Sequence, residues 1–283
     1  MSAPLRLSYF LALSVAAACS SPGHSPSSSR GGATPVPSDG LRIVTYNIKH
    51  GLGMDGALDL ERIAGVLEPL DADVVLLQEV DERCERSGGI DQAAWLGERL
   101  GMTPRFAPFM DYDGGRYGLA TLSRLPVAAS EVVVLPPGER EPRAALLVAV
   151  ELQGRSVTVA NAHLDWLADD ARRLAQAGTL AGSLAAALRN GPVVLGGDLN
   201  DVPESPTLRL LASDAESGGA GLRRIGPDES TFSSEQPERT IDHFLVGPSS
   251  GVWTVSGVRV VDERVASDHR PVVADLAFAL GSP

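Results

Sequence analysis

The sequence is short of cysteine, aromatic residues and positive charge. Its 283 residues include two cysteines and 5% aromatic residues, and 36 acidic side chains outnumber 24 basic ones, for a formal net charge of −12. Lys49 is the only lysine. Affinity for nucleic acid comes largely from neutralised phosphates, so this balance disfavours a nucleic-acid coat protein but leaves room for a local basic groove. The charged fraction, 21%, is ordinary for a folded chain and excludes wholesale disorder.

The first residues have the pattern of an export signal. Arg6 and the amino terminus precede an apolar stretch, Leu7–Ala18, which is too short for a spanning helix and leads directly to Cys19. Cys19 is similar to the lipid-modified cysteine of bacterial lipoproteins, although Ala16 stands where such signals more often have leucine. Cleavage by an ordinary signal peptidase is the alternative. We therefore expect a signal peptide at residues 1–19, lipidation at Cys19, and an exported cell-envelope lipoprotein held to the membrane by an N-terminal lipid anchor.

A tether and a single folded domain are expected after this signal. Residues 20–40 are rich in Ser, Pro and Gly and bury too little apolar surface to become ordered, so they are interpreted as a flexible spacer. Residues 41–283 form the expected domain. If Cys19 is acylated, only Cys84 remains in it, so the domain has no internal disulfide and depends on its core for stability. Cys84 itself is expected to be an incidental loop or edge thiol.

Helices and strands alternate along the domain. Ala72–Val80 is a continuous apolar run, as expected of a strand covered on both faces, and Asp59–Leu70 has apolar residues at helical spacing. Helices mixed with hairpin-linked strands predict an α/β domain with two packed sheets. The expected strands are Arg42–Ile48, Ala72–Val80, Tyr117–Ser123, Val127–Val134, Ala144–Leu152, Ser156–Ala162, Val193–Leu195, Ile241–Val246, Val255–Val261 and Pro271–Phe278; the expected helices are Asp59–Leu70, Asp91–Leu100, Asp165–Arg189 and Ser205–Leu211, and Ser213–Asp228 is expected to be a surface loop.

Polar side chains that can carry chemistry follow the predicted buried strands. One acid at a strand end is usually a cap or turn residue, because Asp and Asn bond their own backbone there. A whole set of Asp, Glu, Asn and His at several strand ends is not explained in that way and points to a site on the connecting loops. The set comprises Asn47, Glu79, Asn161, His163, Asp198, Asn200, Asp242, Asp268 and His269.

The motifs around these residues, taken in order, resemble the endonuclease/exonuclease/phosphatase (DNase I-like) superfamily over about residues 41–280. The resemblance implies a four-layer α/β sandwich with two packed mixed sheets and a site between their edges. The matching motifs are Thr45-Tyr46-Asn47-Ile48, Leu77-Gln78-Glu79-Val80, Tyr117-Gly118, Asn161-Ala162-His163-Leu164-Asp165, Gly197-Asp198-Leu199-Asn200-Asp201, Ile241-Asp242-His243 and Ser267-Asp268-His269-Arg270-Pro271-Val272.

The resemblance implies a metal site and a set of phosphate contacts. Glu79 matches the principal metal-binding acid, with Asn47 beside it and Asp268 as a second acid. Oxygen ligands without cysteine suit Mg²⁺ or Mn²⁺. The implied roles of the others are orientation or deprotonation of the attacking water for Asp198, phosphate contact for Asn200, His163, Tyr117 and His269, and orientation of His269 for Asp242. Whether Asp198 or His269 is the general base stays open at this point.

Several neighbouring residues have two interpretations. Arg143 is either a substrate contact or a member of an ordinary surface ion pair. Asp165 and Asp201 are better explained as turn or cap residues, and His243 as a residue that packs beside Asp242.

The expected activity is metal-dependent hydrolysis of a phosphate ester by a monomer. The arginines are scattered among acids, which is poor for a long phosphate track, so a small or lipid-derived ester is favoured over nucleic acid. A membrane anchor would also raise the local concentration of phospholipid headgroups. A secreted DNase I-like nuclease is the enzymatic alternative, and a non-catalytic binding lipoprotein is the alternative of another class. The complete set of strand-end residues favours an enzyme.

Overall fold

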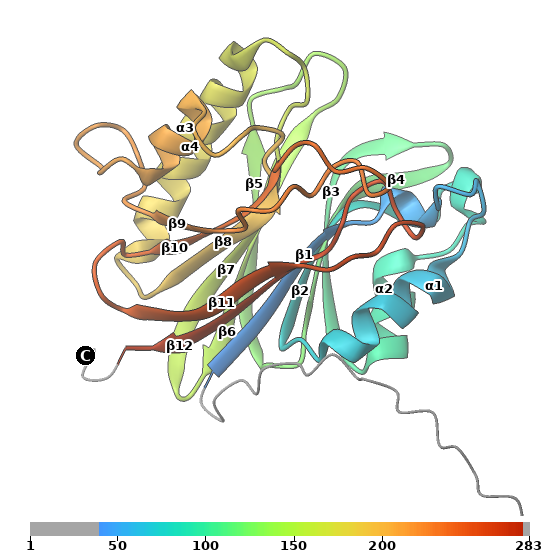
Figure 1. Ribbon diagram of the computed structural model, residues 1–283, viewed down its shortest axis with the longest axis horizontal. Helices are drawn as coiled ribbons and strands as arrows, with labels where there is room; N and C mark the ends of the chain where they lie inside the picture. Colours follow the sequence, from blue (N-terminus) through green and yellow to red (C-terminus); the bar gives the residue numbers. More distant parts are fainter. Residues whose placement is uncertain (1–39, 280–283) are drawn as a thin grey trace, which may run out of the picture. The chain divides into compact units, whose positions relative to one another are not determined.

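Two six-stranded sheets face each other in the computed structural model, which describes residues 40–279 (Figure 1). The first sheet has the order β11-β12-β1-β2-β4-β3 and the second the order β5-β6-β7-β8-β10-β9. The strands are β1 (Gly40–Asn47), β2 (Val74–Glu82), β3 (Thr103–Tyr112), β4 (Gly115–Ser123), β5 (Val127–Leu135), β6 (Arg143–Leu152), β7 (Arg155–His163), β8 (Val193–Asp198), β9 (Arg223–Gly226), β10 (Asp242–Gly247), β11 (Trp253–Val260) and β12 (Val272–Phe278).

Both sheets are mixed. β1 runs parallel to β2, and β7 runs parallel to β8, while the other paired strands are antiparallel. Parallel neighbours need a crossover connection, and helices provide it in both cases. The turn Gln153-Gly154 joins β6 to β7 with positive φ at both residues, as a two-residue hairpin requires.

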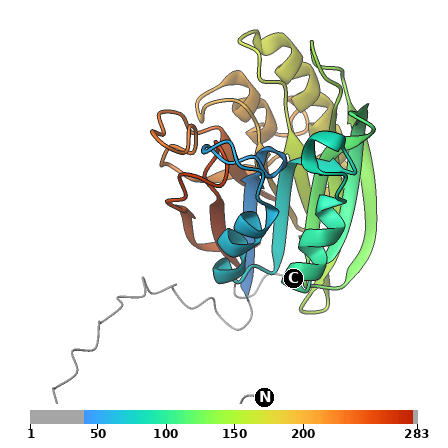
Figure 2. The same ribbon diagram turned by 90° about the vertical axis from the view of Figure 1, so that its right-hand side faces the viewer.

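Helices cover the outer face of each sheet, which confirms the four-layer sandwich (Figures 1 and 2). A side chain at the N-cap position accepts a backbone hydrogen bond at the start of every α-helix described, which satisfies one of the amides that a helix start leaves unpaired. No helix in residues 40–279 is long and apolar enough to span a membrane. The helices are α1 (Leu60–Leu67), α2 (Gln92–Leu100), α3 (Asp170–Leu188) and α4 (Pro206–Ala212), with 3₁₀ turns at Lys49–Gly51, Glu68–Leu70 and Glu85–Ser87.

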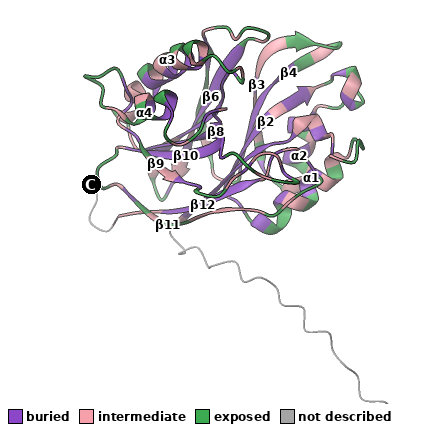
Figure 3. Cartoon of the chain, turned by 45° about the horizontal axis from the view of Figure 1, so that its top comes forward, coloured by how far each residue is buried: buried purple, intermediate pink, exposed green. Residues whose placement is uncertain are grey.

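Three apolar layers hold the sandwich together, and buried residues concentrate on the strands (Figure 3). The central layer lies between the sheets and includes Leu76 and Phe244. The outer layers pack α1 and α2 on the first sheet, around Ile63, and α3 and α4 on the second, around Leu180. Because apolar burial supplies most of the driving force for folding, this core explains how the domain is stable without a disulfide.

The structure corrects several expectations. The stretch Ser213–Asp228 is not all loop, because β9 (Arg223–Gly226) pairs with β10. β3 was not anticipated, and α3 begins at Asp170 rather than at Asp165. Cys84 lies in the loop after β2, as expected, but it is fully buried, and its Sγ donates to the carbonyl of Tyr112. The predicted signal peptide, Cys19 and almost all of the tether lie outside the described residues.

Candidate active site

Strand register places the predicted polar residues side by side. In the second sheet, His163 is the register partner of Asp198 on β8, and Asp198 in turn faces Asp242 on β10. In the first sheet, Asn47 ends β1 beside Gln78 of β2. These ends meet at one edge of the sandwich, so residues far apart in sequence gather at one place.

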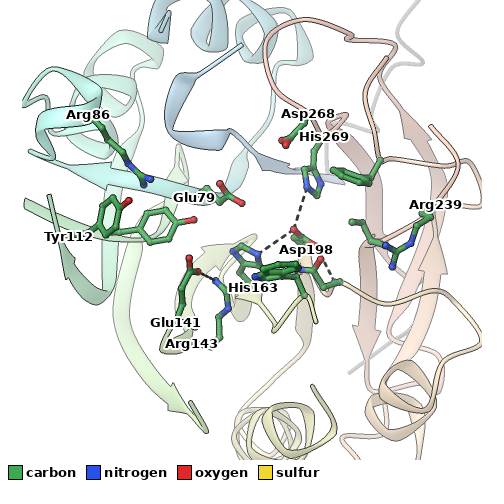
Figure 4. A pocket seen from close by; sticks show the side chains of 15 residues that line it. Glu79, Arg86, Tyr112, Glu141, Arg143, His163, Asp198, Arg239, Asp268 and His269 are labelled. Atoms are coloured by element: carbon green, nitrogen blue, oxygen red, sulfur yellow. Dashed lines mark hydrogen bonds and ion pairs between the residues drawn. The ribbon is translucent and has the colours of Figure 1, made fainter. Parts of the chain in front are cut away.

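Glu79 reaches this place because β2 is interrupted by a bulge. The register with β4 passes from Leu77–Ala120 to Val80–Gly118, so two residues of β2 stand opposite one of β4. Glu79 has φ +57°, which a non-glycine residue rarely adopts. The bulge separates two neighbouring side chains: Gln78 donates to Asn161 Oδ1 at 2.7 Å within the buried core, while Glu79 lines the cavity (Figure 4). The strand's irregularity is what aims the carboxylate.

Acids and an amide form the part of the site that suits a cation. Nδ2 of Asn47 donates to Glu79 Oε1 at 3.0 Å and to Asp198 Oδ2 at 3.1 Å. Burial raises the pKa of Glu79, because the protein around it does not fully compensate the negative charge of its carboxylate. Asp268 forms an ion pair with Lys49, whose Nζ lies 3.1 Å from Asp268 Oδ2. The carboxylates of Glu79 and Asp268 offer only oxygen ligands, which fits Mg²⁺ or Mn²⁺. Asn47 turns its Nδ2 toward the carboxylates, and its Oδ1 accepts from the amide of Lys49 at 3.1 Å, so Asn47 would offer its oxygen to an ion only after its amide turns over.

Histidines and acids form the neighbouring part. Nδ1 of His269 lies 2.9 Å from Asp242 Oδ2, and its Nε2 lies 3.6 Å from Asp198 Oδ2. Burial opposes a charge on His269, but Asp242 and Asp198 raise its pKa to about 10. Nε2 of His163 lies 3.4 Å from the same Asp198 oxygen, yet burial, Arg143 and His269 hold the pKa of His163 well below 6.5. At neutral pH one histidine is therefore charged and the other is neutral.

Asp198, Asp242 and His269 also lie close enough to one another to hold a metal ion, with ligand atoms within 4.8 Å. We assign them instead to a hydrogen-bonded chain. Nδ1 of His269 faces Asp242 Oδ2 at 2.9 Å and its Nε2 faces Asp198 Oδ2 at 3.6 Å, so both ring nitrogens are directed at carboxylates. Thr231 Oγ1 donates to the same Asp242 carboxylate at 2.5 Å and fixes it further.

Burial raises the pKa of Asp198 to about 7, although nearby His269 opposes the rise. His163, His269 and Asn47 all lie next to the Oδ2 atom of Asp198. A carboxyl group poised near neutral pH can accept a proton from a bound water and release it again.

The remaining predicted residues complete the wall of a cavity of about 380 Å³. Asn200, with φ +52°, donates from its backbone to Asp198 Oδ1 at 3.0 Å and from Nδ2 to the carbonyl of Leu164 at 3.1 Å. Tyr117 is buried and packs edge-on against Phe109, and burial raises its hydroxyl pKa well above 10. The structure thus brings together all nine of the predicted site residues that it describes: Asn47, Glu79, Tyr117, His163, Asp198, Asn200, Asp242, Asp268 and His269.

Arg143 belongs to this cavity, and the surface ion-pair interpretation is wrong. Its side chain is 2% exposed, at the cavity wall, and Nη1 lies 3.0 Å from Glu141 Oε2. Nε of Arg143 and Nδ1 of His163 are buried and make no hydrogen bond among the described residues. Buried polar atoms without partners are uncommon in native proteins, and an anion in the cavity would supply acceptors.

The cavity also contains residues that sequence reasoning missed. They come from separate loops and strands and no local motif marks them, because Arg86 belongs to an ordinary run of charges and the aromatic residues resemble core positions. They are Arg86, Tyr112, Glu141, Trp166, Phe232 and Arg239, whereas Ile241, which also lines the cavity, belongs to the Ile241-Asp242-His243 motif.

Three neighbours have structural roles, as expected. Asp165 caps a turn by accepting from the amide of Leu167 at 2.9 Å. Asp201 pairs with buried Arg173 at 3.3 Å. His243 packs behind Asp242, where its Nε2 bonds the carbonyl of Asp201 at 2.8 Å.

Several solved structures are similar to this chain. An endonuclease/exonuclease/phosphatase from Beutenbergia cavernae has a similar structure, with 26% identity, a TM-score of 0.64, and coverage of 85% of this chain and 72% of that one. The human Nocturnin catalytic domain with bound sulfate has 21% identity and a TM-score of 0.66, covering 85% and 94%. A mannosyl-6-phosphatase from Bacteroides thetaiotaomicron has 19% identity and a TM-score of 0.65, covering 84% and 100%.

The family model for the endonuclease/exonuclease/phosphatase family matches residues 44–269, from β1 to His269 itself. The match therefore includes both halves of the site and both sheets that carry them. The chain belongs to the endonuclease/exonuclease/phosphatase family, whose members hydrolyse phosphate esters.

Proposed function

We propose that this chain is a Mg²⁺- or Mn²⁺-dependent hydrolase of small phosphate esters. The observation that carries the proposal is the meeting, in one cavity, of oxygen ligands for a hard cation with buried Arg143 and His163. Nε of Arg143 and Nδ1 of His163 make no hydrogen bond among the described residues. The acidic residues suit a cation, and Arg143 and His163 suit a phosphate. A bound cation and a bound phosphate would also compensate each other's charge.

Each residue then has a role set by its surroundings. Glu79, Asn47 and Asp268 would hold the ion, which would neutralise charge on the phosphate oxygens. Protonated His269, held by Asp242, donates to a phosphate oxygen, and Arg143, Asn200, Tyr117 and His163 are placed to contact the others. These donors stabilise the negative charge that accumulates in the transition state.

We infer that Asp198, not His269, accepts the proton. His269 is already protonated at neutral pH, whereas Asp198 has its pKa raised to about 7 by burial. The attacking water loses a proton to Asp198 as its oxygen bonds phosphorus. The ester P–O bond breaks, and the leaving oxygen takes a proton from solvent water.

A small ester suits this chain better than nucleic acid. The formal charge of −12 repels a long polyanion, while the arginines of the cavity act only over its small volume. A mannosyl-6-phosphatase and a domain with bound sulfate are among the structural neighbours, in keeping with a phosphate-sized anion site. A secreted nuclease stays the enzymatic alternative, and a non-catalytic binding protein the alternative of another class.

The test is hydrolysis by the purified full chain of p-nitrophenyl phosphate, bis-p-nitrophenyl phosphate, plasmid DNA and a phospholipid panel, with Mg²⁺, Mn²⁺ or EDTA. We expect metal-dependent turnover of at least one small ester and little of plasmid DNA. Turnover equal in the His269→Ala variant would reveal a contaminant or a misassigned site. No metal-dependent turnover on any substrate would reject the enzymatic proposal.

We also propose that the chain is exported and anchored through a lipid on Cys19. The support is the sequence pattern of residues 1–19. Intact-mass analysis of native material should show the added mass of lipid on a chain that begins at Cys19. An unmodified Cys19 would retire this proposal and leave the enzymatic one unaffected.

A further inference from the structure

Asn161 is the one residue of the strand-end set that has no role in the proposed chemistry. It lies on β7, two residues before His163, and its side chain is fully buried between the sheets. We propose that Asn161 is a positioning residue that holds the bulge of β2 and thereby keeps the carboxylate of Glu79 at the cation site. The part of this inference that concerns the cation rests on the proposed function.

The side-chain amide of Asn161 reaches from the second sheet to two strands of the first. Its Nδ2 donates to the carbonyl of Leu77 on β2 and to the carbonyl of Ala120 on β4, both at 2.9 Å. Leu77 and Ala120 are the last register pair before the bulge. Because Nδ2 has two hydrogens, each carbonyl takes one, and the amide links the two strands at the point where their ladder is interrupted.

The orientation of this amide is fixed by its partners. Oδ1 of Asn161 accepts from Gln78 Nε2 at 2.7 Å. An amide turned the other way would place Oδ1 against two carbonyl oxygens and Nδ2 against a donor. Leu77, Gln78 and Ala120 are all fully buried, so loss of the Asn161 side chain would leave two carbonyls and a donor away from water.

The bulge decides which way Glu79 points. Leu77 and Val80 both pack in the apolar layer beneath α1 and α2. Side chains of a regular strand alternate, so without a bulge Glu79 would share the face of Leu77, and Val80 would face the other sheet. The bulge absorbs one residue, and Glu79 lines the cavity instead of entering the apolar layer.

The bulge needs support because Glu79 has an unfavourable backbone conformation. Its φ of +57° costs free energy and persists only where the surrounding structure fixes it. On the side of β1, the backbone gives this support, since the amide of Ile48 donates to the carbonyl of Gln78 at 3.1 Å. On the side of β4, the register is broken, and the side chain of Asn161 joins the two strands there.

The first test measures Mn²⁺ binding to the purified full chain by calorimetric titration. Asn161→Ala should bind Mn²⁺ about tenfold more weakly than the wild type, as found for residues that orient metal ligands. The Mn²⁺ concentration for half-maximal hydrolysis of bis-p-nitrophenyl phosphate should rise by a similar factor. By contrast, kcat at saturating Mn²⁺ should stay within about threefold of the wild type, because Asn161 acts through Glu79 and not on the substrate.

Two control variants separate this role from a general loss of stability. Leu180→Ala opens the apolar layer under α3 and leaves the bulge intact. Thr121→Val changes the residue next to Ala120 on β4, where the hydroxyl makes no hydrogen bond among the described residues. Both controls should keep their Mn²⁺ affinity within about twofold of the wild type. An equal loss of affinity in Leu180→Ala and Asn161→Ala would overturn the proposal, as would an unchanged affinity in Asn161→Ala.

A second readout needs neither metal nor substrate. Hydrogen exchange of the full chain in EDTA is followed by mass spectrometry on peptides that span β2 and β8. Asn161→Ala should speed exchange in β2 about tenfold more than in β8, because the opening is local to the bulge, whereas Leu180→Ala should not favour β2. If the wild type binds no Mn²⁺, the proposed function fails and this comparison decides alone: equal acceleration in β2 and β8 would overturn the positioning role.

A further pair of variants applies if Asn161→Ala does not fold. The double variant Gln78→Leu/Asn161→Leu replaces the buried polar pair with apolar side chains, which is tolerated better than removal of one partner. It is compared with Gln78→Leu alone, which leaves both donations of Asn161 in place. The double variant should bind Mn²⁺ about tenfold more weakly than Gln78→Leu. Equal affinity in these two variants would overturn the proposal.

Discussion

The two sheets contribute different chemistry to one site. The first sheet carries Asn47 and Glu79, which would hold the cation in the proposed function, and the second carries His163, Asp198 and Asp242, which would handle protons and phosphate. Neither sheet has a complete site of its own. The activity therefore depends on the central apolar layer that fixes one sheet against the other.

His269 is the exception that joins the halves. It precedes β12 of the first sheet, yet its ring is held by Asp242 of the second. Asn47 makes the reciprocal link from β1 to Asp198 at 3.1 Å. The proposed function thus assigns metal binding to the first sheet and proton transfer to the second, and each sheet sends one polar side chain, His269 or Asn47, to the other.

The largest expected loss of activity follows from removing His269, the side chain that joins the two sheets. His269→Ala removes a charged donor that two buried acids sustain, so kcat/KM should fall about 10³-fold. Steady-state assays on the best small ester measure this. The folded state is checked by thermal unfolding, and a loss below tenfold in a folded variant would place His269 outside the chemistry.

The cation half is tested through Glu79. Glu79→Gln should weaken Mn²⁺ binding by about 10–100-fold, because one anionic ligand is lost, and activity should recover partly at high Mn²⁺. Calorimetric titration measures the affinity. Glu82→Gln is the matched control, since Glu82 lies on the same strand but pairs with Arg116 outside the cavity. Equal affinities in the two variants would break the assignment of the cation to the first sheet.

The stability of the metal-free chain should depend on pH through His269. Its pKa is raised from 6.5 to about 10, so its stabilisation is complete below pH 6.5 and disappears as the pH rises toward 10. Urea unfolding in EDTA should therefore show a free energy of unfolding that falls by about 1 kcal/mol per pH unit between pH 7 and 9. The fall should be shallower in His269→Gln, and an identical slope would show that other groups cause it.

The smallest effect is expected at Lys49. Its ammonium lies 3.1 Å from Asp268 Oδ2 and competes with a cation for that carboxylate. Lys49→Gln should thus raise the affinity for Mn²⁺ about fivefold, as expected when a partly exposed charge pair is removed. Arg62→Gln, which breaks an ion pair with Asp55, is the control. Weaker binding in Lys49→Gln would instead show that Lys49 holds Asp268 in its ligating position.

Much of the fold and of the site's centre follows from the sequence. The strand β2 is predictable from its apolar run, and Asp198 from its place after a buried strand. The missed features depend on partners distant in sequence: β3 is half-exposed over much of its length and pairs only with β4, and four-residue β9 is a strand only through β10. Periodicity carries no information about such pairing.

The orientation of the site residues was also beyond sequence reasoning. The bulge that aims Glu79 arises from the register of β2 with β4, not from a local signal. Arg143 looked equally consistent with a surface ion pair until its 2% exposure placed it in the cavity wall. Tyr112 contributes to that wall from the end of β3 and Trp166 from the loop after β7, and only the tertiary structure brings both to the cavity.

The central claim, that the two sheets build one site acting on one bond, is tested by a double-mutant cycle. kcat/KM on one small ester is measured for the wild type, Glu79→Gln, His269→Ala and the double variant. Residues that act as a unit are strongly non-additive, so the double variant should lose at most about tenfold more than the worse single variant. Losses that multiply in full would contradict the account and show that the cation half and the proton-handling half act independently.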